Sequence, residues 1–181
     1  METKEYRTID KSDWGPGAWQ NEPDKMQWRD EATGFPCLIV RSPLGNLCGY
    51  VGITEGHPWF GKDYNRGKVT SCDGCDHEND YHYACTPAGN LRVHGGITYS
   101  DFCQPSKNEA KGICHLPSPG EPDHVYWFGF DCGHCDDLSP TMERRLQMFS
   151  SDRLIYRDLA YVREQVASLA LQLKEASSAS T

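Results

Sequence analysis

The chain has 181 residues, with 26 acidic against 18 basic side chains and a formal net charge of −8. This length suits one domain with an apolar core, and an aromatic content of 11% is typical of a folded chain. The negative charge would repel phosphate backbones, which argues against a duplex nucleic-acid binder. No apolar run approaches the length of a membrane span, so we expect no membrane contact.

The amino-terminal residues are polar and lack the apolar segment of a signal peptide, so we expect a cytoplasmic protein. The chain contains nine cysteines, an odd number that does not suit a framework of disulfides. We therefore expect reduced thiols, some of them bound to a metal ion.

The order of the expected elements predicts an α+β fold with an antiparallel sheet of about five strands. Residues 1–24 are polar and interrupted by Gly and Pro, and we interpret them as an arm laid across the core. The first three strand-like runs are separated by short turns, which predicts an antiparallel meander. The five predicted strands are Lys25–Asp30, Phe35–Arg41, Leu47–Ile53, Leu91–Thr98 and His124–Asp131.

The carboxyl-terminal segment is predicted to be an amphipathic helix over 151–175, with a cap within Ser150–Arg153. Its apolar seam consists of Ile155, Leu159, Val162, Val166, Leu169 and Leu173. The seam suits packing on the sheet, and the alternative is pairing with a second copy in a homodimer. We expect one domain over 1–175 and a disordered tail over 176–181.

The long connection over 54–90 contains the sequence Cys72-Asp-Gly-Cys75 and, after a short loop, His82-Tyr-Ala-Cys85. Two such pairs supply the four thiolate and imidazole ligands of a closed, structural Zn²⁺ site. His77 is an alternative ligand to His82. A rival arrangement joins the first pair to Cys132-Gly-His-Cys135, but the local one closes a shorter loop at a lower entropic cost.

A second group of polar residues brackets two predicted strand ends. It comprises Val93-His94-Gly95-Gly96-Ile-Thr-Tyr99-Ser100 and Phe130-Asp131-Cys-Gly-His134. Glycines beside a histidine can expose backbone N–H groups to a bound anion, and two histidines can exchange protons with a substrate. We expect His94, Asp131 and His134 to be catalytic, and Gly95, Gly96, Tyr99 and Ser100 to bind the ligand. The alternative is that His94 is a core histidine and that Asp131 caps a turn.

A third segment, Thr54-Glu-Gly-His57-Pro-Trp59-Phe-Gly-Lys62-Asp-Tyr64, leaves the third predicted strand. Aromatic faces beside a Lys and a His suit a nucleobase or a sugar phosphate. We therefore add His57, Trp59, Lys62 and Tyr64 to the ligand-binding residues. The alternative is that the aromatic residues pin the loop to the core.

The motifs in Gly45–Gly61, Val93–Ser100 and Tyr126–His134 resemble a family of small proteins found mainly in bacteriophage and prophage genomes. The 72–85 insert looks like an addition that shorter relatives lack. The resemblance brings no established activity. It implies a phage accessory gene that acts in a host cytoplasm, where many such genes counter host immunity.

Together these features predict binding of a small anionic, nucleotide-like ligand, for instance a host immune signal, followed by phosphodiesterase-like hydrolysis. One alternative is a non-catalytic sponge that sequesters the ligand. Another is an inhibitor of a host protein that uses the acidic surface to imitate nucleic acid.

Overall fold

The computed structural model describes residues 2–70, 83–104, 106–142 and 154–179, which form one six-stranded antiparallel sheet and a long helix. The strand order is β1-β2-β3-β4-β6-β5. The strands are β1 (Lys4–Tyr6), β2 (Lys25–Arg29), β3 (Pro36–Arg41), β4 (Leu47–Ile53), β5 (Tyr99–Phe102) and β6 (Tyr126–Asp131). The α+β fold class is confirmed, with one strand more than predicted.

The meander β2–β3–β4 is confirmed, because each strand pairs antiparallel with the next one along the chain. Strand β6 then pairs with β4, and β5 lies at the edge next to β6. The prediction was wrong over Leu91–Thr98, where the chain forms turns and the strand begins only at Tyr99. Strand β1 lies in the amino-terminal arm. It has three residues, too few to predict a strand from the sequence.

The alternation of side chains along the strands divides the core into two layers. The layer under the long helix contains Cys37, Ile39, Val51, Phe128 and Phe130. The opposite layer contains Leu38, Val40, Cys48, Tyr50, Val125 and Trp127. The sheet is therefore apolar on both faces, and each face needs its own cover.

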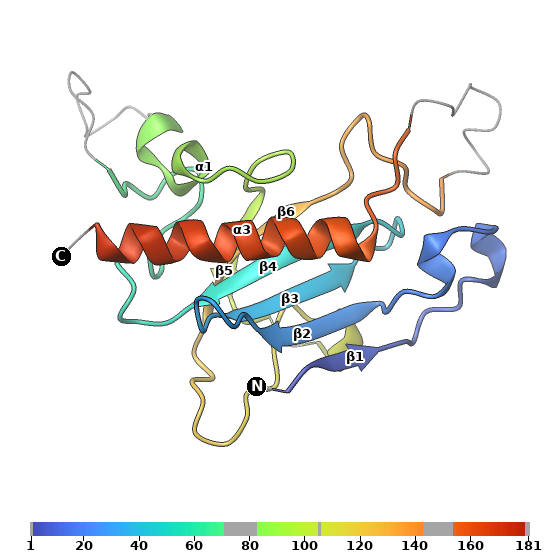
Figure 1. Ribbon diagram of the computed structural model, residues 1–181, viewed down its shortest axis with the longest axis horizontal. Coiled ribbons are helices and arrows are strands. Elements are labelled where there is room, and N and C mark those ends of the chain that lie inside the picture. Colours follow the sequence, from blue (N-terminus) through green and yellow to red (C-terminus); the bar gives the residue numbers. More distant parts are fainter. Residues whose placement is uncertain (1, 71–82, 105, 143–153, 180–181) are drawn as a thin grey trace.

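Helix α3 (Leu159–Ser178) covers the first face and contacts β4 and β3, as Figure 1 shows. Four predicted seam residues, Val162, Val166, Leu169 and Leu173, are fully buried there. Gly49 of β4 permits this contact, since a Cβ atom at Gly49 would lie 2.6 Å from Val166. The seam thus packs on the protein's own sheet.

The boundaries of α3 differ from the prediction. The side chain of Asp158 accepts a hydrogen bond from the Tyr161 N–H and caps the helix, so the predicted cap within Ser150–Arg153 was wrong. Ile155 lies before the helix and is 54% exposed. At the other end the helix continues to Ser178, into the tail that we expected to be disordered.

The second face of the sheet is covered by the connection from β5 to β6. The side chains of Lys25 and Gln27 reach from β2 to this connection and donate hydrogen bonds to its carbonyl oxygens. A disulfide joins Cys103 to Cys114 within the connection, which differs from the expectation of reduced thiols. Trp127 packs beneath it, with its indole N–H 3.4 Å from the Cys103 sulfur.

The remaining described helices are short: η1 (Ser12–Trp14), η2 (Ala18–Gln20), η3 (Tyr83–Cys85), α1 (Pro87–Asn90) and η4 (Glu109–Lys111). Within the described residues, no helix has both the length and the apolar character needed to cross a membrane.

Candidate functional site

His94, His134 and Asp137 come together beside the start of α3, and we call them the histidine cluster. The His94 Nε2 atom lies 2.7 Å from the Asp137 Oδ2 atom, and the His134 Nδ1 atom lies 3.5 Å from the same oxygen. The ring centroids of the two histidines are 5.3 Å apart. Two segments that lie forty residues apart in the sequence thus present one compact group of ligand-type atoms.

Gly95 makes the approach of the two histidines possible. Its φ angle is +64°, and a Cβ atom there would lie 2.0 Å from the His134 ring. Any other residue would strain the backbone and push the ring away. The space beside this glycine is therefore occupied by the His134 ring.

Helix α3 orients His94 from the other side. The Gln165 side-chain oxygen accepts a hydrogen bond from the His94 backbone N–H, at 2.9 Å. The Tyr161 hydroxyl lies 3.0 Å from the His94 Nδ1 atom. Both histidine nitrogens are therefore engaged, one by a carboxylate and the other by a phenol, which fixes the plane of the ring.

Asp137 is the buried centre of the histidine cluster, with a side chain only 1% exposed. Its Oδ1 atom accepts a hydrogen bond from Arg157 Nε at 2.8 Å, and its Oδ2 atom accepts one from the His134 backbone N–H at 3.1 Å. Burial acts to raise the pKa of Asp137, but the hydrogen bonds from His94, Arg157 and His134 outweigh burial and lower it. Asp137 is therefore held as a carboxylate.

The histidine cluster can hold a metal ion, since one ligand atom from each residue lies within 4.8 Å of the others. Ligand atoms about 2.0–2.1 Å from a tetrahedral ion are about 3.3 Å apart, and the 2.7 and 3.5 Å distances bracket that spacing. The His134 Nδ1 atom is buried and makes no hydrogen bond. A buried nitrogen without a partner is costly unless another atom, such as a metal ion, binds it.

Asp131, the carboxylate that we expected to act with the histidines, does not lie in this cluster. It accepts hydrogen bonds from the Thr98 hydroxyl and the Gly133 N–H, both at 2.9 Å. Asp137 takes the expected place beside His94 and His134. The spacing of three residues between His134 and Asp137 was a usable sequence signal for Asp137. No comparable sequence signal pointed to Tyr161 or Arg157.

His57 and Trp59 lie in the core rather than in a ligand site. His57 is 7% exposed; its Nε2 atom lies 2.8 Å from the Leu173 carbonyl oxygen, and its Nδ1 atom accepts the Trp59 N–H. Burial lowers the pKa of His57, with the Leu173 carbonyl opposing that effect. Trp59 packs edge-on against Phe128. The observed packing matches the alternative given for the 54–64 segment, in which its aromatic residues attach the loop to the core.

The other predicted ligand-binding residues form a separate group around β5. The Ser100 hydroxyl accepts a hydrogen bond from the Tyr64 N–H at 2.9 Å and lies 3.1 Å from the Tyr126 hydroxyl oxygen, to which it can donate. The Tyr126 hydroxyl donates to the Lys62 carbonyl. Tyr99 packs edge-on against Tyr50, in the second core layer. Among the predicted ligand-binding residues, Gly95 lies against the His134 ring, and Gly96 follows it in the chain.

The predicted zinc ligands Cys72, Cys75 and His82, and the alternative His77, lie outside the described residues. Cys85 is described: it is buried at the end of η3 and is in a disulfide-bonded form, in which it is no thiolate ligand. From the rival pair, Cys132 is buried and Cys135 is exposed.

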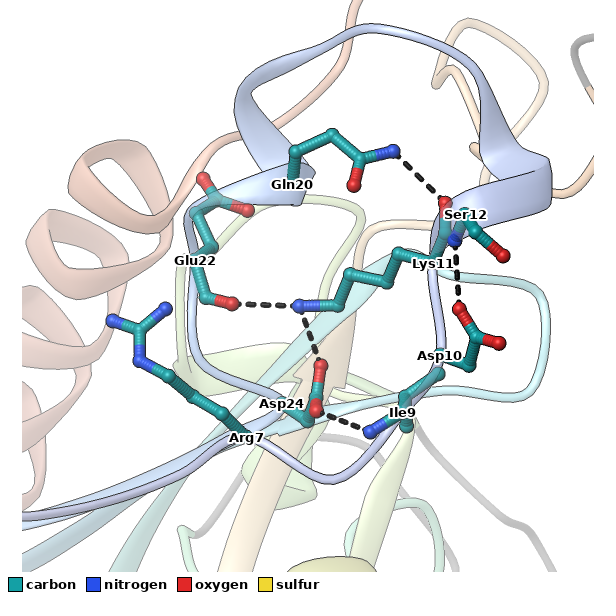
Figure 2. Close-up of a pocket in the computed structure, with 8 residues that line it drawn as sticks. All are labelled: Arg7, Ile9, Asp10, Lys11, Ser12, Gln20, Glu22 and Asp24. Carbon is teal, nitrogen blue, oxygen red and sulfur yellow. Dashed lines mark hydrogen bonds and ion pairs between the residues drawn. The ribbon is translucent and has the colours of Figure 1, made fainter.

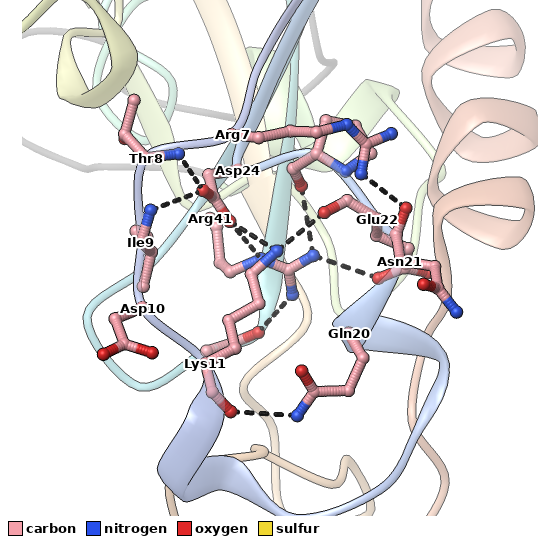
Figure 3. A network of polar contacts seen from close by, with 12 residues as sticks. Arg7, Thr8, Ile9, Asp10, Lys11, Gln20, Asn21, Glu22, Asp24 and Arg41 are labelled. Carbon is pink, nitrogen blue, oxygen red and sulfur yellow. Dashed lines mark hydrogen bonds and ion pairs between the residues drawn. The ribbon is translucent and has the colours of Figure 1, made fainter.

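A second polar cluster lies at the amino-terminal arm, where Lys11, Glu22, Asp24 and Arg41 form what we call the ion network. Lys11 Nζ lies 2.6 Å from Asp24 Oδ1, and the Arg41 guanidinium lies 3.0 Å from Glu22 and 3.4 Å from Asp24. Figure 2 shows Lys11 reaching across a pocket of about 340 Å³ to Asp24 and to the Glu22 carbonyl. Figure 3 shows the arm wrapped around the network, where Asp24 also accepts the Thr8 and Ile9 N–H groups.

The ion network also holds the segment that leads into α3. The Tyr156 hydroxyl donates a hydrogen bond to Glu22 Oε2 and accepts one from Arg41. The Leu159 N–H, in the first turn of α3, donates to Glu22 Oε1 at 2.8 Å. Arg157 lies between these two anchored residues and points to Asp137. The two polar clusters are therefore joined through one short segment.

Comparison of the chain with protein-family models, with curated proteins and with solved structures finds no match. The function of the histidine cluster must therefore be inferred from its own chemistry.

Proposed function

We propose that the protein is a Zn²⁺-dependent hydrolase of a small anionic, nucleotide-like ligand, with His94, His134 and Asp137 as the metal ligands. The observation that carries the proposal is the buried His134 Nδ1 atom, which has no hydrogen-bond partner and lies 3.5 Å from Asp137 Oδ2. Two imidazoles and a carboxylate suit zinc, and three protein ligands leave a coordination position open for water.

The surroundings of the histidine cluster support a ligand role for His94. With zinc on Nε2, its Nδ1–H group would donate to the Tyr161 oxygen, which now lies 3.0 Å away. Metal-bound histidines commonly donate their second N–H to such a partner, which fixes the tautomer. Both nitrogens would then be occupied, so this role replaces the proton exchange that the sequence suggested for His94.

A zinc ion at such a site lowers the pKa of a bound water to about 7 and stabilises charge on a phosphoryl oxygen. In the proposed reaction the water oxygen forms a bond to phosphorus while the bond from phosphorus to the leaving oxygen breaks. A proton from the attacking water passes to the leaving oxygen, so a linear phosphodiester would give two products and a cyclic one would give a single ring-opened product. Ligands of this class include cyclic nucleotides of the kind used as immune signals.

The test is incubation of the zinc-loaded protein with a panel of cyclic and linear nucleotides, followed by chromatography. We expect turnover of at least one compound, and we expect His134→Gln to lower the rate by at least about 100-fold. The matched control is His124→Gln, because His124 is exposed and stacks on Phe102, away from the histidine cluster. If no compound is turned over and bound ligand is released intact, the protein is a sponge and the proposal fails.

A further inference from the structure

Among the described residues, Arg157 is a cationic neighbour of the histidine cluster, and only its Nε atom makes a hydrogen bond that involves the cluster. Its Nε atom donates to Asp137 at 2.8 Å, and its side chain is 21% exposed while that of Asp137 is 1% exposed. Within residues 2–70, 83–104, 106–142 and 154–179, no acceptor takes a hydrogen bond from its Nη1 or Nη2 atoms. A guanidinium with its outer nitrogens free is suited to binding an oxyanion through two parallel hydrogen bonds.

The conformation of Arg157 is fixed from two sides. Its guanidinium carbon lies 5.0 Å from the centre of the Tyr161 ring, in a cation–π contact, and Tyr161 in turn contacts His94. Its backbone lies between Tyr156 and Leu159, both of which are hydrogen-bonded to Glu22. An arginine that is already immobilised loses little conformational entropy when it binds an anion.

We propose that Arg157 binds a phosphate group of the substrate next to the metal ion, which makes the substrate class a phosphate ester rather than a neutral ester or amide. This inference rests on the proposed zinc hydrolase. Arg157 neutralises Asp137, so the divalent ion keeps its positive charge at the site, although the whole chain carries −8. A local positive field of this kind attracts anions that the rest of the surface repels.

The accessible side of the histidine cluster agrees with this role. The His134 side chain is 35% exposed and that of Arg157 is 21% exposed, whereas that of His94 is 13% exposed. A ligand that approaches the metal ion would therefore pass the two more exposed side chains.

The experiment measures inorganic phosphate binding to the protein at saturating zinc by isothermal titration calorimetry. We expect Arg157→Gln to weaken phosphate binding by about 10- to 100-fold, which is the loss of one strong charged hydrogen-bonding pair. Arg157→Lys keeps the charge but not the planar pair of donors, so we expect an intermediate loss. The matched control is Arg163→Gln in helix α3, where the guanidinium lies over Trp28 instead.

The outcomes separate the two proposals. Phosphate affinity that is unchanged in Arg157→Gln, or that falls equally in Arg163→Gln, overturns the role of Arg157. For an active wild type, the loss should appear in the KM of a phosphate ester more than in kcat, because the contact is made in the bound ground state as well. If the wild type binds phosphate through Arg157 but hydrolyses nothing, the hydrolase proposal fails and the anion site stands.

Discussion

The ion network and the histidine cluster are both groups of buried charged and polar residues, and they differ in how their charges are paired. In the ion network each charge has an opposite charge within 3.4 Å, and two cations face two anions. Buried atoms without a hydrogen bond occur in both groups: Asp24 Oδ1 and Arg41 Nε in the ion network, and His134 Nδ1 in the histidine cluster. The first two carry opposite charges and lie 3.4 Å apart, whereas His134 Nδ1 belongs to an imidazole that is charged only when it is protonated. The ion network is closed and suits a structural role, whereas the histidine cluster is left open toward a ligand.

The largest effect should come from breaking the ion network. The Arg41 side chain is fully buried, and Arg41→Met would leave Glu22 without its cation, Asp24 with Lys11 alone, and the Tyr156 hydroxyl without a donor. Removing one partner from a buried ion pair costs about 3–5 kcal/mol, so we expect the free energy of unfolding to fall by that amount. Urea-induced unfolding followed by tryptophan fluorescence measures it.

The control for this change is Lys4→Met, which breaks an ion pair with Glu109 in which the two side chains are 48% and 58% exposed. Exposed pairs contribute about 0–1 kcal/mol, so the control should stay close to the wild type. Equal losses in the two variants would mean that burial does not distinguish the ion network from an ordinary surface pair.

The next effect concerns the histidine cluster, where a change should affect zinc more than folding. We expect Asp137→Asn to lower zinc affinity by at least about 100-fold, because a carboxamide is a poor ligand and presents an N–H₂ group to Arg157 or His94. Asp131→Asn, which removes a carboxylate outside the cluster, should change zinc affinity by less than about threefold. Competition titration with a chromophoric chelator measures both, and equal losses would exclude Asp137 as a ligand.

The contrast between Asp131 and Asp137 also shows how far the sequence predicts the site. The alternation of apolar residues predicted β2, β3, β4 and β6, because burial on two faces imposes a period of two on each strand. The same alternation places Asp131 on the sheet face that carries Trp127. Phe130 and α3 lie on the opposite face, and α3 is the helix whose side chains contact His94. This alternation, which can be read from the sequence, therefore separates Asp131 from the two histidines.

Other features could not be predicted from local patterns. The turn within residues 91–98 depends on Gly95 and Gly96, which both have positive φ angles. At Gly95 the absence of a side chain also leaves room for the distant His134 ring. The roles of Tyr161 and Arg157 depend on where α3 begins, and this is fixed by Asp158 and by the distant Glu22. Contacts across more than a hundred residues leave no periodic signal in the sequence.

A third effect, smaller than the first two, should come from closing the space between the histidines. Gly95→Ala and Gly96→Ala both place a Cβ atom at a positive φ angle, +64° and +86°, and each should cost about 1–2 kcal/mol of stability. Only at Gly95 does the added atom meet His134, while at Gly96 nothing lies within 4 Å. We therefore expect Gly95→Ala alone to weaken zinc binding, by about 10-fold.

The two alanine variants are matched controls for each other in the same chelator titration and in urea unfolding. Equal zinc affinities would show that His134 needs no close contact with the backbone of Gly95. If only one variant loses stability, the positive φ angle does not cost both positions a similar free energy, which contradicts the prediction.

The smallest effect tests whether His57 is buried with all its partners inside the protein, as the ion network is, or belongs to an open site. Its pKa is lowered by burial, so the native state resists a proton that the unfolded chain accepts below about pH 6.5. Stability from neutral His57 is therefore fully present above that pH and decreases as the pH falls through the unfolded pKa toward the folded one.

In His57→Gln this contribution disappears, because a glutamine side chain does not titrate and can still offer an N–H group to the Leu173 carbonyl oxygen. We expect the stability of the wild type relative to His57→Gln to be greatest at pH 8 and to shrink at pH 5.5. Urea unfolding of both proteins at the two pH values measures the difference, and His124→Gln, at an exposed histidine, serves as the control. Parallel pH curves for the wild type and His57→Gln would contradict a buried neutral imidazole. They would reopen the ligand-binding role that the sequence suggested for His57, because an accessible imidazole titrates without a folding penalty.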